Sequence, residues 1–543
     1  MARTSVADAV ADESRAPVAG IAGGAGSGRR RGVPQDRLRA LLAALPIPAL
    51  LVAVATILLR AINLGRSWDI FVDEISYLRL SQSVAQDLTV KLYGGTFYLH
   101  PPAFFFVQAG WLRLLRPSGP VIEQVYAVRP LVVLLAAASA VLLYSLARRL
   151  GGPLSAAAAA VIFALDPYVI RTNSRDMLET PALFWVLAGY ALVFPAIPSG
   201  DPRGHPPFPA WRALAAGVAF GLAVLTKDMM VFLTLLPLAI CFALNWALPR
   251  RATLLVAAVA VATYLPYLLI IMAVGEWGRF GDQKLRGLYR FLGLVKESGF
   301  KRQGGPSLTR SILANLDQFG TTYVLLGAGL VALVILLLHG DRAQRLLLAW
   351  ATSAYVLLAY SIGFGTIEEQ FFYFLTVPCI LATSVSVAII LRLGRPADRW
   401  WRPVRLLLAF AGIVFVSWTA FAWLRTHTTP DNGYERARAY LDANVPIGSR
   451  IAVTTEPAVF LMDGYESGSW ATIEEVQGNR AEYVLVSTKE IISGLGYARP
   501  DFYDWLIAHG EVVFRFRGRT NGDLLIYRLS VSDGMGQRGY AIP

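Results

Sequence analysis

Charged residues are scarce in this chain of 543 residues, where Asp, Glu, Lys and Arg together make up only 16%. Soluble globular proteins carry about 25% of these residues, so the composition excludes an ordinary soluble protein of this length. Hydrophobic residues reach 55%, and the mean hydropathy is +0.50. Apolar runs of roughly 18 or more residues recur along the chain, and each is a candidate transmembrane helix. The sequence therefore predicts a polytopic membrane protein.

Cysteine is almost absent too, since the chain has only Cys241 and Cys379, both within apolar runs. The polar segments therefore contain no disulfide framework. The net charge of +13 does not indicate nucleic-acid binding, because the Lys and Arg of a membrane protein collect on its cytoplasmic side. Residues 1–40 are rich in Ala, Gly and Arg and precede the first apolar run. They lack the features of a secretory signal, and we interpret them as a disordered cytoplasmic tail.

Positive charge gives the predicted orientation of the spans. Arginines in the tail place the N-terminus in the cytoplasm, so the first span, residues 41–63, runs outward. The next cytoplasmic marker is the pair of Arg148 and Arg149, which makes 129–147 an inward span and leaves 64–128 outside. Later apolar runs alternate in the same way, giving about eleven spans in all.

One segment of the outer loop has two interpretations. The stretch HPPAFFFVQAGWLRLL, which begins at His100, is short, has prolines at its start and carries Arg113. We expect it to form a helix that lies in the outer interface of the bilayer. The alternative is a pair of short spans through residues 102–128, with Arg113 and Arg116 on the cytoplasmic side.

The last part of the chain has a different pattern. Residues 430–543 contain strand-like runs, SRIAVTT, AEYVLVST, GEVVFRFRG and DLLIYRLS, and two runs with helical spacing, YERARAYLDANV and PDFYDWLIAHG. Strands that alternate with helices predict a small α/β domain. The alternation of spans places this domain on the extracytoplasmic side.

Carboxylates and basic side chains gather in the loops that are predicted to lie outside. Asp73 and Asp176 lie within about one helix turn of a span, where an unpaired carboxylate is costly. A carboxylate held there by a neighbouring Arg or His could act as a general base. Lys and Arg on the same face suit a phosphate group. The loops contain Asp73, Glu74, His100, Asp166, Arg171, Arg175, Asp176, Glu179, Lys227, Asp228, Glu368, Glu369 and the basic residues between 276 and 318.

Other classes of protein would show parts of this pattern. A charge at a span end is often only solvated, and Lys227 could extend toward water from the end of its span. A membrane transporter or lipid flippase also carries acids within its spans. It would, however, show paired half-chains with interrupted helices at matching positions, and no such pairing is visible. A non-catalytic membrane scaffold would leave Asp73 dispensable.

Several short motifs follow one another in a specific order. They are the Asp73–Glu74 pair with Tyr77, His100-Pro101-Pro102, Arg129, Asp176 in SRDMLETP, and GLAVLTK from Gly221 to Lys227. In order and spacing this set resembles the GT-C membrane glycosyltransferases that use polyprenyl-phosphate sugars. The nearest relatives by this resemblance are the protein O-mannosyltransferases and the bacterial aminoarabinose transferases that act on lipid A. The resemblance covers about residues 40–425.

The resemblance implies an all-α, multi-pass GT-C membrane domain at residues 41–425, in which Asp73 is the catalytic base. Asp73 would deprotonate an acceptor hydroxyl or amine. That nucleophile would attack the anomeric carbon of the sugar and release the polyprenyl phosphate, with inversion. Asp176 would orient the acceptor or the base.

The resemblance also implies a phosphate-binding cation near the leaving group. Arg175, Lys227 and the basic residues of loop 276–318 are the candidates, in that order. No cofactor is certain: Glu74 and His100 could hold a divalent cation, but one His among scattered acids is not a specific metal signature. The candidates for substrate binding are Glu74, Tyr77, His100, Arg175 and Lys227.

The donor class follows from the same resemblance, whereas the acceptor stays open. The donor would be a polyprenyl-phosphate sugar, and the acceptor a lipid, a glycan or a protein of the cell envelope. The C-terminal domain would bind this acceptor, act as a lid or simply stabilise the chain. Enrichment in Ala, Gly and Arg is typical of a bacterium with high GC content, which predicts the bacterial plasma membrane as the location. One departure is Tyr373 in EEQFFYF, which lacks the Arg that often precedes it in relatives, so a contact made by that Arg is in doubt.

Overall fold

The computed structural model describes residues 47–197, 208–295, 307–364, 369–393, 401–494 and 496–529. The predicted tail, residues 1–40, lies outside the described residues, as do Lys296, Lys301, Arg302 and Glu368. Within the described residues helices dominate, and strands occur only in a two-stranded ribbon and a five-stranded sheet.

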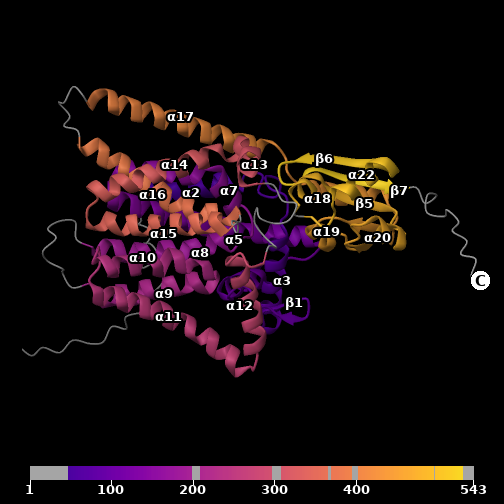
Figure 1. The fold of residues 1–543 in the computed structure, drawn as a ribbon, viewed down its shortest axis with the longest axis horizontal. Coiled ribbons are helices and arrows are strands. Elements are labelled where there is room, and N and C mark those ends of the chain that lie inside the picture. Colours follow the sequence, from indigo (N-terminus) through magenta and orange to yellow (C-terminus); the bar gives the residue numbers. More distant parts are fainter. Residues whose placement is uncertain are drawn as a thin grey trace, which may run out of the picture. The chain divides into compact units, whose positions relative to one another are not determined.

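Most of the helices form one bundle around a continuous apolar core that includes Tyr190, Phe220 and Trp350 (Figure 1). The bundle consists of α2 (Ile47–Ala61), α5 (Val121–Gly151), α6 (Pro153–Leu165), α7 (Pro167–Asn173), α8 (Glu179–Val193), α9 (Ala210–Thr226), α10 (Val231–Leu244), α11 (Arg250–Ala273), α14 (Leu316–His339), α15 (Arg342–Phe364), α16 (Glu369–Leu393) and α17 (Trp401–Thr428). Short 3-10 turns at Phe194–Ala196 and Asp228–Met230 extend α8 and precede α10.

Six helices of the described residues are long and apolar enough to cross a membrane, namely α5, α11, α14, α15, α16 and α17. The bent pair of α6 and α7 makes a seventh when it is counted as one span. The shorter apolar helices α2, α8, α9 and α10 fall where further spans are expected. The protein is thus a multi-pass membrane protein, while the number of about eleven spans stays a prediction.

The break between α6 and α7 has a chemical cause. The two helices are bent by 63° at Asp166, which is followed by Pro167. Proline has no N–H for the hydrogen bond that would continue α6. The Asp166 carboxylate caps α7 instead, because it accepts from the N–H groups of Tyr168 and Val169 at 3.0 Å each. The redirected α7 then leads into the loop 174–178, which carries two of the predicted site residues.

Loops that are predicted to lie on the same side of the membrane meet in space. At the predicted cytoplasmic end, Arg392 donates to the carbonyl of Gly151 at 2.6 Å, and Gln344 to that of Leu150 at 2.8 Å. At the other end of α5, the Arg129 guanidinium donates to backbone carbonyls of the loop 62–71. Segments that are predicted to be cytoplasmic thus contact one another at one end of α5, and segments predicted to lie outside contact one another at the other end. The predicted alternation of spans requires this arrangement.

The loop between α2 and α5 folds into a layer at one end of the bundle. It contains α3 (Val72–Asp87), the ribbon of β1 (Lys91–Leu92) and β2 (Gly95–Thr96), and α4 (Ala103–Leu115). Helix α4 buries Phe104 and Phe105 and exposes Phe106 and Leu114. Its 13 residues extend about 20 Å, which is too short for a bilayer core of about 30 Å. This length favours the interfacial helix over the pair of short spans.

Helix α12 (Trp277–Phe291) packs on this layer, and α13 (Leu308–Ala314) follows it in the chain. The N–H of Tyr98 donates to Gln283 at 2.7 Å, and the rings of Tyr98 and Phe280 meet edge-on at 5.7 Å. Lys284 donates to the carbonyl of Leu99 at 3.2 Å. These contacts bring the basic residues of α12 next to the His100 segment.

The C-terminal region, which we define as residues 430–529, contains a five-stranded sheet (yellow in Figure 1). The strand order is β4-β3-β5-β7-β6; β3 runs parallel to β4 and β5, while β7 runs antiparallel to β5 and β6. Its elements are α18 (Gly433–Asn444), β3 (Arg450–Val453), α19 (Glu456–Leu461), β4 (Glu466–Gly468), α20 (Ile473–Gly478), β5 (Tyr483–Ser487), α21 (Thr488–Ser493), α22 (Pro500–His509), β6 (Gly510–Gly518) and β7 (Gly522–Leu529).

The C-terminal region and α3 share one apolar cluster. Ile75 and Leu78 of α3 pack in the same cluster as Tyr434, Leu441 and Leu485 of the C-terminal region. Burial of such side chains favours association by about 25 cal/mol per Å² of apolar surface. The helix that carries Asp73 is therefore supported from both sides, by the bundle and by the sheet. The placement of this region outside the membrane stays a prediction.

A buried ion pair joins α3 to α5. Nε and Nη2 of Arg129 donate to the two carboxylate oxygens of Glu74 at 2.9 Å each, and both side chains are fully buried. Nη1 of Arg129 donates to the carbonyls of Leu64 and Trp68 at 2.9 and 3.0 Å. One arginine thus fixes the helix and the loop that precedes it.

We expect Arg129→Ala to lower the free energy of unfolding by about 3–5 kcal/mol, because it leaves the Glu74 carboxylate buried without its cation. The matched control is Arg148→Ala, at the exposed end of the same helix, which should change it by less than about 0.5 kcal/mol. Melting temperatures in detergent measure both. Equal shifts for the two variants would contradict the assigned role of Arg129.

Candidate active site

Helix α3 presents two acids in its first turn, in different surroundings. The Asp73 side chain is partly exposed, and its Oδ2 accepts from the Tyr77 hydroxyl, one turn later, at 3.3 Å. Glu74 is buried against Arg129 and also accepts from the N–H groups of Phe71 at 3.1 Å and Asp176 at 2.9 Å. The structure thus favours a positioning role for Glu74 over direct substrate contact, and it leaves Asp73 accessible.

Asp176 ends a chain of hydrogen-bonded side chains. The Ser81 hydroxyl donates to Gln108 at 2.9 Å, and Nε2 of Gln108 donates to Oδ2 of Asp176 at 2.5 Å. Burial raises the pKa of Asp176 well above its ordinary value, and the charge of Glu74 raises it further. Asp176 therefore holds a proton more readily than an exposed aspartate. It suits the orientation of a substrate or of the base, as the resemblance implies.

Lys227 lies in a second buried ion pair, with Glu179. The ammonium group contacts Oε1 of Glu179, and the two side chains are 4% and 0% exposed. The pair joins the start of α8 to the end of α9. Glu179 is a member of the site that the motifs did not single out. A signal was present, because an acid at the start of an apolar run needs a cation.

His100 lies beside Tyr77, with the two rings edge-on at 6.1 Å. Burial lowers the pKa of His100 well below its ordinary value, and the charges of Lys227, Lys284 and Arg290 lower it further. The imidazole is therefore neutral near pH 7. Two of the three cations come from α12, so the structure brings the basic loop next to the HPP element.

Tyr77 is the point at which these groups meet. Burial raises the pKa of Tyr77 well above its ordinary value, and the charges of Asp73, Glu179 and Asp176 add to the shift. Five of the predicted site residues therefore gather around one helix face: Asp73, Tyr77, His100, Asp176 and Lys227. Glu74 fixes their surroundings through its bonds to the N–H of Asp176 and to Arg129.

Arg175 has a different environment. Its Nη2 donates to the carbonyl of Asp69 at 2.9 Å and to the hydroxyl of Thr520 at 3.1 Å, so it contacts the C-terminal region. Its guanidinium lies 5.6 Å from the centre of the Trp68 ring. Trp68, Asp69 and Thr520 carry no motif, and the sequence offered no signal for them.

Buried polar atoms without a hydrogen-bond partner among the described residues concentrate in the loop that joins α7 to α8. They are both donors and acceptors, as a ligand with several hydroxyl groups would require. The atoms are Nδ2 of Asn173, Oγ of Ser174, Nε of Arg175, Oδ1 of Asp176 and Oε2 of Glu179. Unsatisfied hydrogen-bonding capacity is thus present beside the predicted site residues Arg175 and Asp176.

A divalent cation has weak support in this arrangement. The described residues contain no group of three or more His, Cys, Asp or Glu side chains that could hold a metal ion. Glu74 and Glu179 are already neutralised by Arg129 and Lys227. The divalent cation therefore stays a prediction.

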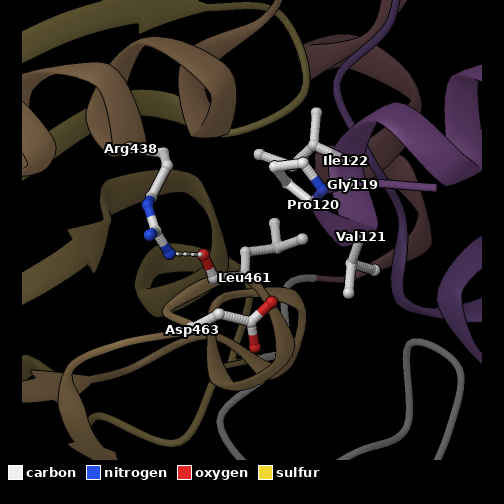
Figure 2. Close-up of a pocket in the computed structure, with 7 residues that line it drawn as sticks. All are labelled: Gly119, Pro120, Val121, Ile122, Arg438, Leu461 and Asp463. Carbon is white, nitrogen blue, oxygen red and sulfur yellow. Dashed lines mark hydrogen bonds between the residues drawn. The ribbon is translucent and has the colours of Figure 1, made fainter.

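Two surface cavities lie away from these residues. One, of about 280 Å³, lies between the start of α5 and the C-terminal region, where Arg438 donates to the carbonyl of Leu461 at 3.1 Å (Figure 2). The other, of about 500 Å³, is lined by residues of α3, α4 and α5, including Arg79, Arg113 and Arg116. Neither is lined by a predicted site residue.

Residues 48–279 match the family described as dolichyl-phosphate-mannose-protein mannosyltransferase. The match contains Asp73, Glu74, His100, Asp176 and Lys227, and ends within α12. No curated protein sequence matches the chain.

The fold is similar to that of two solved membrane enzymes. The archaeal oligosaccharyltransferase AglB from Archaeoglobus fulgidus, in complex with an inhibitory peptide and a dolichol-phosphate, has a TM-score of 0.55 at 14% identity, over 91% of this chain and 75% of that chain. ArnT from Cupriavidus metallidurans, bound to undecaprenyl phosphate, has a TM-score of 0.52 at 15% identity, over 92% and 99%. The predicted GT-C fold is confirmed, and together with the family match it indicates a glycosyltransferase.

The neutral state of His100 predicts a pH dependence of stability. The unfolded chain takes up a proton on His100 near pH 6.5, whereas the folded protein does not, so the free energy of unfolding falls as the pH drops below 6.5. We expect His100→Gln to reduce the loss between pH 7 and pH 5 by about 1 kcal/mol. Melting temperatures at both pH values measure this.

The matched control for this prediction is His509→Gln, at an exposed histidine of α22. It should lose as much stability on acidification as the wild type. If His100→Gln also loses as much, the imidazole is accessible to protons and the description of its surroundings is wrong.

Proposed function

We propose that this protein is a membrane glycosyltransferase that moves a sugar from a polyprenyl-phosphate donor to a cell-envelope acceptor. The reaction takes place on the outer face of a bacterial plasma membrane. Asp73 is the general base, and the transfer inverts the anomeric centre. The N-terminus is cytoplasmic in this proposal, and the C-terminal region is extracytoplasmic.

The accessibility of Asp73 carries the assignment of the base. Four acids lie near Tyr77 and Arg129. Glu74, Asp176 and Glu179 among them are fully buried, and the two glutamates are held by cations. Asp73 is the partly exposed member, and it lies at the start of α3 beside a tyrosine hydroxyl. A base must come within hydrogen-bond reach of the proton it removes, and Asp73 meets that requirement best.

The proposed step is a direct displacement. The Asp73 carboxylate accepts the proton of an acceptor hydroxyl or amine as that atom forms a bond to the anomeric carbon. The bond between this carbon and the phosphate oxygen breaks, and its electron pair leaves with the polyprenyl phosphate. Attack from the face opposite the leaving group inverts the configuration. The unpaired donors and acceptors of the loop after α7 would hold the sugar hydroxyl groups.

Negative charge grows on the phosphate as the bond breaks, so cations near it stabilise the transition state. Among the described residues the candidates are Arg175, Lys227 and the α12 residues Lys284, Arg286 and Arg290. Lys284 pairs with Asp228 at 2.6 Å in a half-exposed position, and Lys227 is held by Glu179. Arg175 has a buried Nε without a partner among the described residues, which makes it the best placed of these to gain a phosphate contact.

The donor class is supported by the similar structures. AglB was solved with a dolichol-phosphate and ArnT with undecaprenyl phosphate, and both ligands are polyprenyl phosphates. We infer a donor of this class for the present chain. Its acceptor would be a lipid, a glycan or a protein, since the described residues around Asp73 suit any hydroxyl or amine that can reach it.

We expect Asp73→Asn and Asp73→Ala to lower kcat/KM by a factor of about 10²–10⁴, because the acceptor then keeps its proton. Transfer from a labelled polyprenyl-phosphate sugar in membranes containing the protein measures this. Asp87→Asn, at the exposed far end of α3, is the matched control and should retain activity.

Full transfer by both Asp73 variants would exclude Asp73 as the base. Failure of the wild type to consume any polyprenyl-phosphate sugar would exclude the donor class. Melting temperatures of the variants show whether a loss of activity comes from a loss of fold.

A further inference from the structure

The turn between β6 and β7, Arg519–Asn521, contacts the loop that precedes α3. Nδ2 of Asn521 donates to Oδ2 of Asp69 at 2.7 Å. Arg519 donates to the carbonyl of Ser67 and, at 2.9 Å, to that of Thr426. Asn521 and Asp69 are 452 residues apart in sequence, so the turn joins distant parts of the described chain.

The same turn is fixed within the C-terminal region. The N–H of Thr520 donates to both oxygens of Asp431 at 3.2 Å, and its hydroxyl donates to Oδ2 of Asp431 at 2.7 Å. The carbonyl of Asn521 accepts from the N–H of Lys489 at 3.1 Å. A Cβ at Gly518 would clash with the Asp431 carboxylate, so glycine permits this close approach. The turn therefore presents its side chains in a defined geometry.

The Thr520 hydroxyl is held directly against Arg175. Nη2 of Arg175 donates to this hydroxyl at 3.1 Å and to the carbonyl of Asp69 at 2.9 Å. The guanidinium groups of Arg175 and Arg519 lie 5.6 and 5.2 Å from the centre of the Trp68 ring. Asp69 and Thr520 therefore hold Nη2 of Arg175, while its guanidinium lies over the Trp68 ring. Asp69 and Trp68 also contact the turn, through Asn521 and Arg519.

The remaining donors of Arg175 are available for an oxyanion. Its Nε is buried and has no partner among the described residues, so its N–H can donate a charge-assisted hydrogen bond to a phosphate oxygen. The next residue, Asp176, is bonded through its N–H to Glu74, which directly follows Asp73. The orientation of Arg175 is therefore linked to the position of the proposed base.

We propose that Thr520 and Asn521 are positioning residues of the glycosyltransferase site, which hold Arg175 and Asp69 so that Arg175 binds the phosphate of the donor. This inference rests on the proposed function. It makes the C-terminal region part of the catalytic unit rather than a stabilising appendage.

The charges at this contact favour an incoming anion. Burial lowers the pKa of Lys489 to about 8, and the positive charges of Arg171 and Arg175 contribute to this shift. Burial and the neighbouring Asp431 raise the pKa of Asp69 to about 8, so near neutral pH this carboxyl compensates the cations only in part. A phosphate would relieve the mutual repulsion of these cations.

The test uses the full-length protein and two readouts, the KM for a polyprenyl-phosphate sugar and the Kd for polyprenyl phosphate. Thr520→Val keeps the shape of the side chain and removes the hydroxyl that Arg175 contacts. We expect it to raise both constants about tenfold and to lower kcat as well, because Arg175 also stabilises the charge that grows on the phosphate. Thr520→Ser keeps the hydroxyl and should restore both constants.

The matched control is Thr454→Val, since the Thr454 hydroxyl also lies in the C-terminal region, where it is buried and, among the described residues, bonds to the carbonyl of Leu485 at 3.0 Å and not to Arg175. It should leave KM and Kd unchanged. A double-mutant cycle adds specificity: if Thr520 acts through Arg175, then Thr520→Val has no further effect on Kd in an Arg175→Gln background.

An unchanged Kd in Thr520→Val would overturn the positioning role, as would effects of Thr520→Val and Arg175→Gln that simply add. Equal losses in Thr520→Val and Thr454→Val would assign the effect to folding and also contradict it. If the wild type neither binds polyprenyl phosphate nor consumes its sugar conjugate, the proposed function fails instead.

Discussion

Neutralisation of buried charge by partners that are distant in sequence is the constraint on which the candidate site depends. A charged carboxylate buried near a bilayer without a cation is costly, so each buried acid either pairs with a cation or, like Asp176, has a raised pKa. Glu74 meets Arg129 across 55 residues, and Glu179 meets Lys227 across 48. Each pair joins two helices. The pairing that satisfies the charge therefore also fixes the helix ends from which the remaining site residues project.

With two acids held in this way, the proposed chemistry is assigned to Asp73 and Asp176. Asp73 is partly exposed at the start of α3, and Asp176 has a raised pKa and a carboxylate oxygen without a partner among the described residues. The loop after α7 adds further unsatisfied donors and acceptors. The two ion pairs fix the helix ends, and the polar atoms without hydrogen-bond partners are left for a substrate. Such a site is organised before its substrate binds, so little reorganisation is needed during the reaction.

Much of the site could be predicted because its residues lie in short motifs, and the charges of Asp73, Asp176 and Lys227 are conspicuous beside apolar runs. The partner of Glu74 could not be found, since nothing local pairs it with a residue 55 positions away. The bend at Asp166 agrees with the sequence, since a capping Asp followed by Pro is typical of the start of a new helix. Thr520 had no signal at all, because a polar turn between two strands is equally typical of an ordinary hairpin.

The turn at residues 519–521 has a consequence for how the protein is made. Every motif of the membrane domain is synthesised before residue 430, yet the contacts to Asp69 and Arg175 come from the last strand pair. A nascent chain would therefore contain the proposed base and its neighbours without the geometry that they need. If the turn orients Arg175 as proposed, the chain reaches its full affinity for the donor phosphate only after its last strand pair has been synthesised and has folded onto the earlier loops.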